Sequence, residues 1–169
     1  NAGTINITPT AATVWSATNI GATGIGGSID ISGSTVTRGA STGVLTLQAN
    51  GPNAAGTGTG GTVAVTATGA AGDILFNSGS TIINTRGGTT AGSGGAVTLT
   101  AGRDVKYSGA TSAINSTPSA GAGTGGDIKI TASKTATNGV LTLGLVGGIV
   151  SSGSATGAGN GGSIIITNN

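Results

Sequence analysis

The sequence predicts an all-β protein folded as a right-handed parallel β-solenoid. Three observations predict this fold: a phrase that recurs at nearly constant spacing, apolar and polar residues that alternate within it, and 36 glycines among 169 residues. The phrase is a glycine doublet followed by a short alternating run, and it begins at Gly26, Gly60, Gly94, Gly125 and Gly161. Repetition at such a period is typical of stacked architectures, in which each unit buries its apolar face against its neighbours.

The spacing of the doublets divides the chain into repeats of a single domain over 1–169. Counted between second glycines, at positions 27, 61, 95, 126 and 162, the steps are 34, 34, 31 and 36 residues, so the repeat is about 34 residues long. We expect a shortened first coil, four full repeats and a partial terminal coil, at 1–25, 26–59, 60–93, 94–124, 125–160 and 161–169. The solenoid would then have about five to six coils.

Each full repeat is expected to contain three short strands separated by clusters of Gly, Ser, Asn and Thr, which predicts a three-sided coil. The first strand follows the glycine doublet. Apolar clusters mark the second and third strands, at Val36 and 44–47, 74–76 and 82–83, 105–107 and Ile114, and 140–143 and 149–150. In the shortened first coil, Gly3–Thr8 reads as the opening phrase with one glycine. The right-handed winding is expected because parallel crossovers have that hand.

The alternation within the opening strands assigns their side chains to two inward columns. Successive residues of a strand point to opposite faces, so residues two apart share a face. The first column contains Ile29, Val63, Val97, Ile128 and Ile164. The second contains Ile31, Val65, Leu99, Ile130 and Ile166. Trp15 reads equally well as a core residue of the first coil or as an exposed contact residue.

The composition argues against catalysis and against most cofactors. The chain has no His, no Cys and no Glu, and its carboxylates are four Asp residues. Glycoside hydrolysis needs two facing carboxyl groups, and lyase chemistry needs a base beside a cation. Asp73 and Asp104 occupy equivalent places in neighbouring coils, but we interpret them as turn caps rather than as a cation site. We therefore predict no enzyme activity, no metal and no cofactor.

Binding to nucleic acid and insertion into a membrane are also disfavoured. Charged residues make up 6% of the chain, and its six Lys and Arg residues are dispersed, Arg103 and Lys106 being the nearest to a cluster. Nucleic-acid binding needs clustered cations that displace counterions. No run approaches the ~18 consecutive apolar residues of a membrane span.

One phrase carries a resemblance to a known family. The segment 101–110, Ala-Gly-Arg-Asp-Val-Lys-Tyr-Ser-Gly-Ala, resembles the repeats of filamentous-haemagglutinin-like exoproteins, which are bacterial surface proteins of two-partner-secretion and autotransporter systems. The segment 71–79 is similar to the same phrase, and the glycine-doublet units resemble those of such proteins. The resemblance implies an extracellular or cell-surface β-helical stalk or fibre used in adhesion or matrix formation. Its partners would be other copies, a host or neighbouring cell surface, or a polysaccharide.

The two end coils are expected to mediate self-association. Open end coils of a solenoid present unpaired strand edges and apolar side chains, so each end is a template for the other. Stacking head to tail would produce a filament, or the chain would continue into a longer one. The residues assigned to this role are Ile5, Ile7, Ile164, Ile165 and Ile166.

A regular column of threonines offers an alternative function. Thr66, Thr100, Thr131 and Thr167 follow one another at equivalent outward positions, with Ser32 at the head of the column. Hydroxyls in a regular row on a flat solenoid face are suited to ordering water, as in ice binding, or to contacting a polysaccharide. The neighbouring outward column is mixed, whereas an ice-binding face needs two threonine columns.

Overall fold

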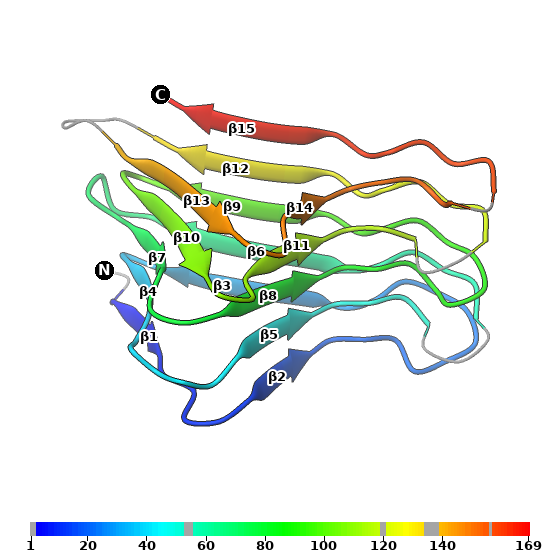
Figure 1. Cartoon of the computed structure of the whole chain (residues 1–169), viewed down its shortest axis with the longest axis horizontal. Helices are drawn as coiled ribbons and strands as arrows, with labels where there is room; N and C mark the ends of the chain where they lie inside the picture. The colour runs from blue at the N-terminus through cyan, green and yellow to red at the C-terminus, as the bar shows by residue number, and fades with distance from the viewer. Residues whose placement is uncertain (1–2, 53–55, 119–120, 134–138, 156) are drawn as a thin grey trace.

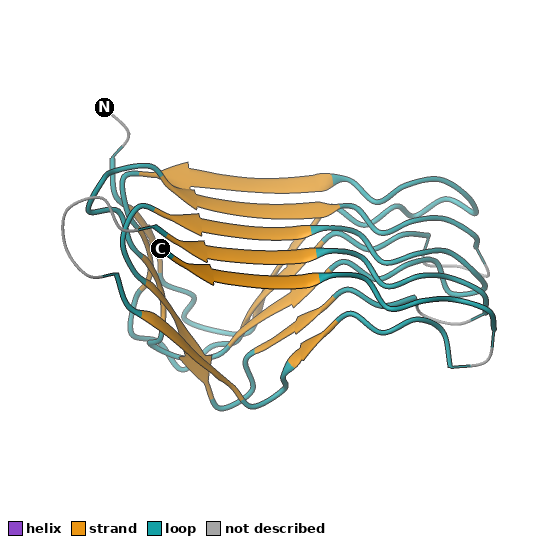
Figure 2. Ribbon diagram, turned by 90° about the horizontal axis from the view of Figure 1, so that it is seen from above, coloured by secondary structure: helices purple, strands orange, loops and turns teal. Residues whose placement is uncertain are grey.

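The computed structural model describes residues 3–52, 56–118, 121–133, 139–155 and 157–169. These residues form fifteen strands and no helix. The strands belong to three five-stranded sheets, and every pairing in them is parallel. The predicted fold, a β-solenoid with three-sided coils, is confirmed (Figures 1 and 2).

Every coil contributes its strands to the sheets in the same order. The first sheet contains β1 (Ile5–Ile7), β4 (Val36–Arg38), β7 (Ile74–Phe76), β10 (Val105–Gly109) and β13 (Leu141–Leu145). The second contains β2 (Thr13–Ser16), β5 (Leu45–Gln48), β8 (Thr81–Asn84), β11 (Ala113–Asn115) and β14 (Ile149–Val150). The third contains β3 (Ser28–Gly33), β6 (Thr62–Ala67), β9 (Val97–Ala101), β12 (Ile128–Ala132) and β15 (Ile164–Asn168).

In cross-section, the third sheet forms one long side of the coil and the other two sheets form a V beneath it (Figure 2). The loops that lead from the second sheet to the third extend beyond the sheets and follow one another from coil to coil. Parallel bridges link Thr23 to Thr57 and Thr57 to Ala91, so these loops are stacked as well.

The four full repeats each supply one strand to each sheet, and their predicted three-strand pattern is confirmed. The described strands comprise four complete coils, with β1 and β2 before them and β15 after them, so the solenoid has about four turns rather than five to six.

The interpretation of Gly3–Thr8 as equivalent to the strands that follow the glycine doublets was wrong. The strand β1 pairs with β4, with Ile5 opposite Val36, and therefore belongs to the first sheet, whereas the glycine-doublet strands form the third. The physical reason is strand order within a coil: β2 follows β1 directly, and the next strand, β3, already occupies the third sheet. Alternation identifies a strand, but its place in the coil decides its neighbours.

The core consists of stacked columns of β-branched and Leu side chains. The two inward columns predicted for the third sheet are in register across all five strands. Val65, Leu99 and Ile130 are fully buried in the middle coils. In the first sheet, Phe76 and Tyr107 lie opposite each other with edge-to-face rings and centroids 5.6 Å apart.

The glycine doublets are required by the close approach of successive coils. A Cβ on Gly61 would lie 1.8 Å from the carbonyl oxygen of Gly27, and a Cβ on Gly95 would lie 1.8 Å from that of Gly61. A Cβ on Gly60 would lie 2.1 Å from the Thr85 carbonyl oxygen of the same coil. The repeated doublet is therefore explained by packing, without any ligand.

Candidate functional site

The third sheet places the predicted threonine column on the outer side of the solenoid. Ser32, Thr66, Thr100, Thr131 and Thr167 are opposite one another on successive strands. The four threonines are half-buried and Ser32 is exposed. The hydroxyl oxygen of Thr131 is buried and has no hydrogen-bond partner among the described residues. Because this hydroxyl is buried, the row of accessible hydroxyls is interrupted at Thr131.

The neighbouring outward column is chemically mixed. It contains Asp30, Ala64, Thr98, Lys129 and Ile165, in register on the same five strands. The outer face thus has one hydroxyl column, interrupted at Thr131, rather than the two that an ice-binding surface needs.

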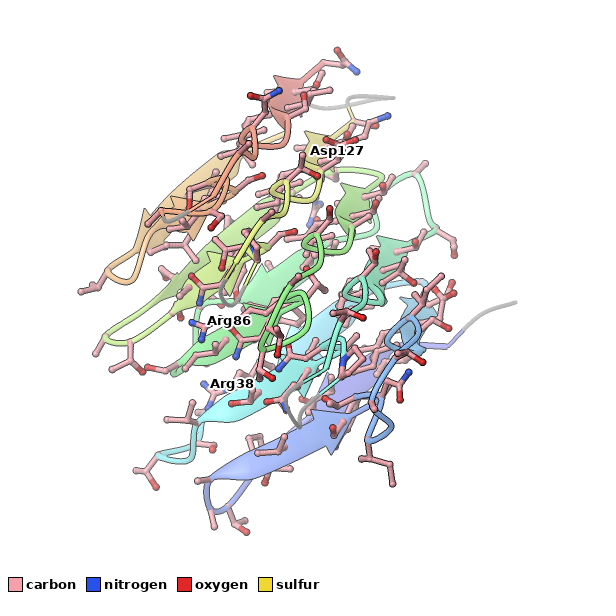
Figure 3. The ribbon with its side chains drawn as sticks, turned by 90° about the vertical axis from the view of Figure 1, so that its right-hand side faces the viewer. Arg38, Arg86 and Asp127 are labelled. Carbon is pink, nitrogen blue, oxygen red and sulfur yellow. The ribbon has the colours of Figure 1, made fainter. Side chains whose placement is uncertain are left out.

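A shallow groove crosses the coils where the third sheet begins. It has a volume of about 530 Å³, and glycines of four doublets line it: Gly60, Gly94, Gly95, Gly125, Gly126, Gly161 and Gly162. Small polar residues line it, among them Thr59, Thr62, Thr124, Asp127 and Ser163. The carboxylate of Asp127 accepts a hydrogen bond from the Ser163 N–H, 2.9 Å away on the next coil. Asp127, Arg86 and Arg38 come from three different coils (Figure 3).

The two buried carboxylates cap the backbone of the following coil. The Asp73 carboxylate accepts a hydrogen bond from the Asp104 N–H at 3.1 Å, and the Asp104 carboxylate accepts one from the Val140 N–H at 2.9 Å. Asp73 is also paired with Arg103, whose Nε lies 2.9 Å from Oδ1. Asp104 is paired with Lys106 at 3.2 Å. These carboxylates were predicted to cap turns, but the hydrogen bonds that they accept join one coil to the next, and cations and backbone N–H groups surround them.

The charge of Asp104 is stabilised where it lies. Burial alone would raise its pKa, but the hydrogen bond from Val140 and the nearby Lys106 and Arg103 outweigh burial. The pKa of Asp104 therefore lies below its ordinary value of 3.8. An ionised carboxylate of this kind is a structural anion rather than a proton donor at neutral pH.

The residues predicted for self-association lie at opposite ends of the solenoid. Ile5 and Ile7 are on β1, at one end of the first sheet, and Ile164, Ile165 and Ile166 are on β15, at the other end of the third (Figure 1). Ile164 and Ile166 belong to the inward columns, yet they are 44% and 47% exposed because no described strand pairs with the free edge of β15. Ile165 points outward, in register with Lys129, so it lies outside the inward columns, and of these five residues it is the one that we no longer assign to stacking.

Trp15 lies in the core column of the second sheet, opposite Leu47, and is 40% exposed at the end of the stack. It lines a cavity of about 420 Å³ together with Ile5, Ile7, Pro9 and Thr13. Trp15 is therefore both a core-column residue and an accessible one.

A buried arginine was missed by the sequence analysis. Arg38 is fully buried, and its guanidinium donates hydrogen bonds to the carbonyl oxygens of Ser78, at 2.6 Å, and of Gly43. Burial lowers its pKa. Alternation could have revealed this residue, because Arg38 lies two positions after the inward Val36.

No family model, curated protein or solved structure matches the chain. Among the described residues there is no group of three metal-ligating side chains, and no helix long and apolar enough to cross a membrane.

Proposed function

We propose that this chain is a structural solenoid segment of an extracellular fibre or adhesin, whose end coils stack on further coils. The observation that carries the proposal is the unpaired outer edge of the first and of the last described strands. The core-column side chains Trp15, at one edge, and Ile164 and Ile166, at the other, are 40% to 47% exposed, and Ile5 is half-buried. Apolar columns beside unpaired strand edges favour the addition of parallel strands.

The order of the strands is compatible with such stacking. At one end the outermost strands of the three sheets are β1, β2 and β3, and at the other they are β13, β14 and β15. When two copies meet end to end, each sheet of one copy has a partner in the other. Further coils of the same polypeptide would use the same edges, so the proposal covers both a polymer and one long chain.

The extracellular and adhesive part of the proposal draws on the resemblance of 101–110 to surface exoprotein repeats. A rigid stalk needs no chemistry, and we assign no catalytic step to the chain. Receptor contacts, in this proposal, are made by the loops between sheets.

Electron microscopy of the chain at micromolar concentration tests the stacking, with two matched variants. Ile166→Lys places a charge in an inward column, where stacking would bury it without a partner at considerable cost. Ile165→Lys places the same charge outward, in register with Lys129. We expect filaments from the wild type and from Ile165→Lys, and separate rods from Ile166→Lys.

Deleting 161–169 should likewise leave a folded rod that does not polymerise. Filaments that persist in Ile166→Lys and in the deletion would rule out stacking through β15. Wild-type chains that stay as separate rods at all concentrations would rule out self-assembly.

A second candidate is binding of a polysaccharide or of ordered water by the threonine column. The observation that favours it is the register that aligns Thr66, Thr100 and Thr167. Replacing Thr66 and Thr100 together by Val keeps the branched shape and removes two hydroxyls. This candidate requires that the double variant lose thermal hysteresis or polysaccharide retention that the wild type shows.

A further inference from the structure

The sequence contains three Asn–Gly pairs, at 50–51, 138–139 and 160–161. In such a pair the backbone nitrogen of the glycine can attack the side-chain amide carbon of the asparagine, because glycine has no side chain to obstruct the approach. Asn138 lies outside the described residues. The other two pairs differ in their hydrogen bonding, so they can be compared directly.

The pair at 50–51 is held at both reacting groups by the next coil. The Asn50 side-chain oxygen accepts a hydrogen bond from the Arg86 N–H at 2.9 Å. The Gly51 N–H donates to the Arg86 carbonyl oxygen at 2.7 Å, and Gly51 is buried. Attack would require both hydrogen bonds to break and the coil to open locally.

Within the part of the chain that the structure describes, both reacting groups of the pair at 160–161 are free. Asn160 is exposed, and the one hydrogen bond that it makes to a described residue is from the Gly125 N–H to its backbone carbonyl, at 2.9 Å. In earlier doublets the first glycine donates to the next coil: Gly60 to Ser93 at 2.9 Å and Gly94 to Thr124 at 2.8 Å. Gly161 has no such acceptor among the described residues.

We propose that Asn160 is a site of spontaneous deamidation and that Asn50 is protected from it. The Gly161 nitrogen forms a bond to Cγ of Asn160 while the bond from Cγ to Nδ2 breaks, and ammonia leaves with the amide proton of Gly161. Water then opens the cyclic imide at Cγ, giving aspartate, or at the backbone carbonyl, giving isoaspartate. The step needs water alone and involves no oxidation or reduction.

The product would change the turn that leads into β15. A carboxylate replaces a neutral amide, and the isoaspartate form adds one carbon to the backbone between Cα of residue 160 and the nitrogen of Gly161. A Cβ at Gly162 would already lie 2.5 Å from the Gly126 carbonyl oxygen, so this region has little room for an altered path. The modification would therefore alter the outermost strand of the third sheet.

Peptide mapping of the folded chain, aged in mildly alkaline buffer, tests the proposal. Cleavage after Arg38, Arg86 and Lys134 puts Asn50 in peptide 39–86 and Asn160 in peptide 135–169. Because the second peptide also contains Asn138, fragmentation in the mass spectrometer must locate the change. We expect Asn160 to deamidate at least about tenfold faster than Asn50, because two hydrogen bonds protect Asn50.

Two controls make the result decisive. In concentrated urea the two residues should deamidate at similar rates, because the unfolded coil no longer protects Asn50. The Asn160→Gln variant should show no early change at position 160. Loss at Asn160 that is no faster than at Asn50 in the folded chain, including no loss at either residue, would overturn the proposal.

Discussion

At the scale of single residues, the second glycines of the two central doublets, Gly61 and Gly95, are among the least replaceable positions. Gly95→Ala would bring a methyl group to 1.8 Å from the Gly61 carbonyl oxygen, whereas Gly3 has no atom within 4 Å of an added Cβ. Forcing coils apart is overpacking of a tight interface, and we expect Gly95→Ala to cost about 3 kcal/mol or more. Gly3→Ala should be close to neutral. Urea unfolding of both variants measures this, and equal midpoints would contradict the packing explanation.

The carboxylate of Asp104 makes a pH-dependent contribution at the same scale. Its pKa is lowered in the folded chain, so its stabilising effect is present above the ordinary pKa of 3.8 and is lost as the pH falls through the folded value. Asp104→Asn should therefore be less stable than the wild type at neutral pH, with the difference shrinking in acid. Thermal melts across this pH range provide the measurement. A difference that stays constant with pH would show that the charge is not the cause.

At the scale of strands, much of the fold could be predicted from the sequence. The doublet period located the third sheet, and alternation identified its inward columns, because a repeated two-residue pattern has only one arrangement that buries its apolar face. The sheet of β1 could not be predicted from its own residues, since pairing depends on strand order in the whole coil. Alternation places Arg38 on the inward side, two positions after Val36, but its partners, the carbonyl oxygens of Ser78 and Gly43, are backbone atoms that no side-chain pattern reveals.

The candidate sites were predictable to a smaller extent. The threonine column and the capping aspartates follow from register, which the repeat provides. The buried hydroxyl of Thr131 and the free backbone N–H of Gly161 depend on local contacts in three dimensions.

Strand position should also govern local stability. The strands β6 and β9 pair with a neighbour on both sides, whereas β1 and β15 each pair on one side only. We expect slow amide exchange in β6 and β9 and much faster exchange in β1 and β15, because end strands open without disturbing the rest. Hydrogen exchange read by mass spectrometry would test this on unassembled chains. Uniform protection from end to end would indicate a solenoid that opens only as a whole.

At the scale of the whole molecule, stacking and chemical ageing should be coupled. A coil laid over β15 would supply an acceptor for the Gly161 N–H, as the coil after Gly125 does for that residue. We therefore expect Asn160 to deamidate more slowly in filaments than in separate rods, with the Ile166→Lys variant ageing at the rate of the rods. Equal rates in both forms would show that this end is not covered in the assembly.

The parallel ladders also determine how the molecule responds to tension. The hydrogen bonds between coils lie across the strands, so a pull that separates the two ends loads the outermost strand first and spares the others. Each coil that peels away releases 31 to 36 residues, or roughly 100–130 Å of extended chain. A stalk built in this way lengthens stepwise under load and dissipates work at every step, while the coils that have not yet opened keep their shape.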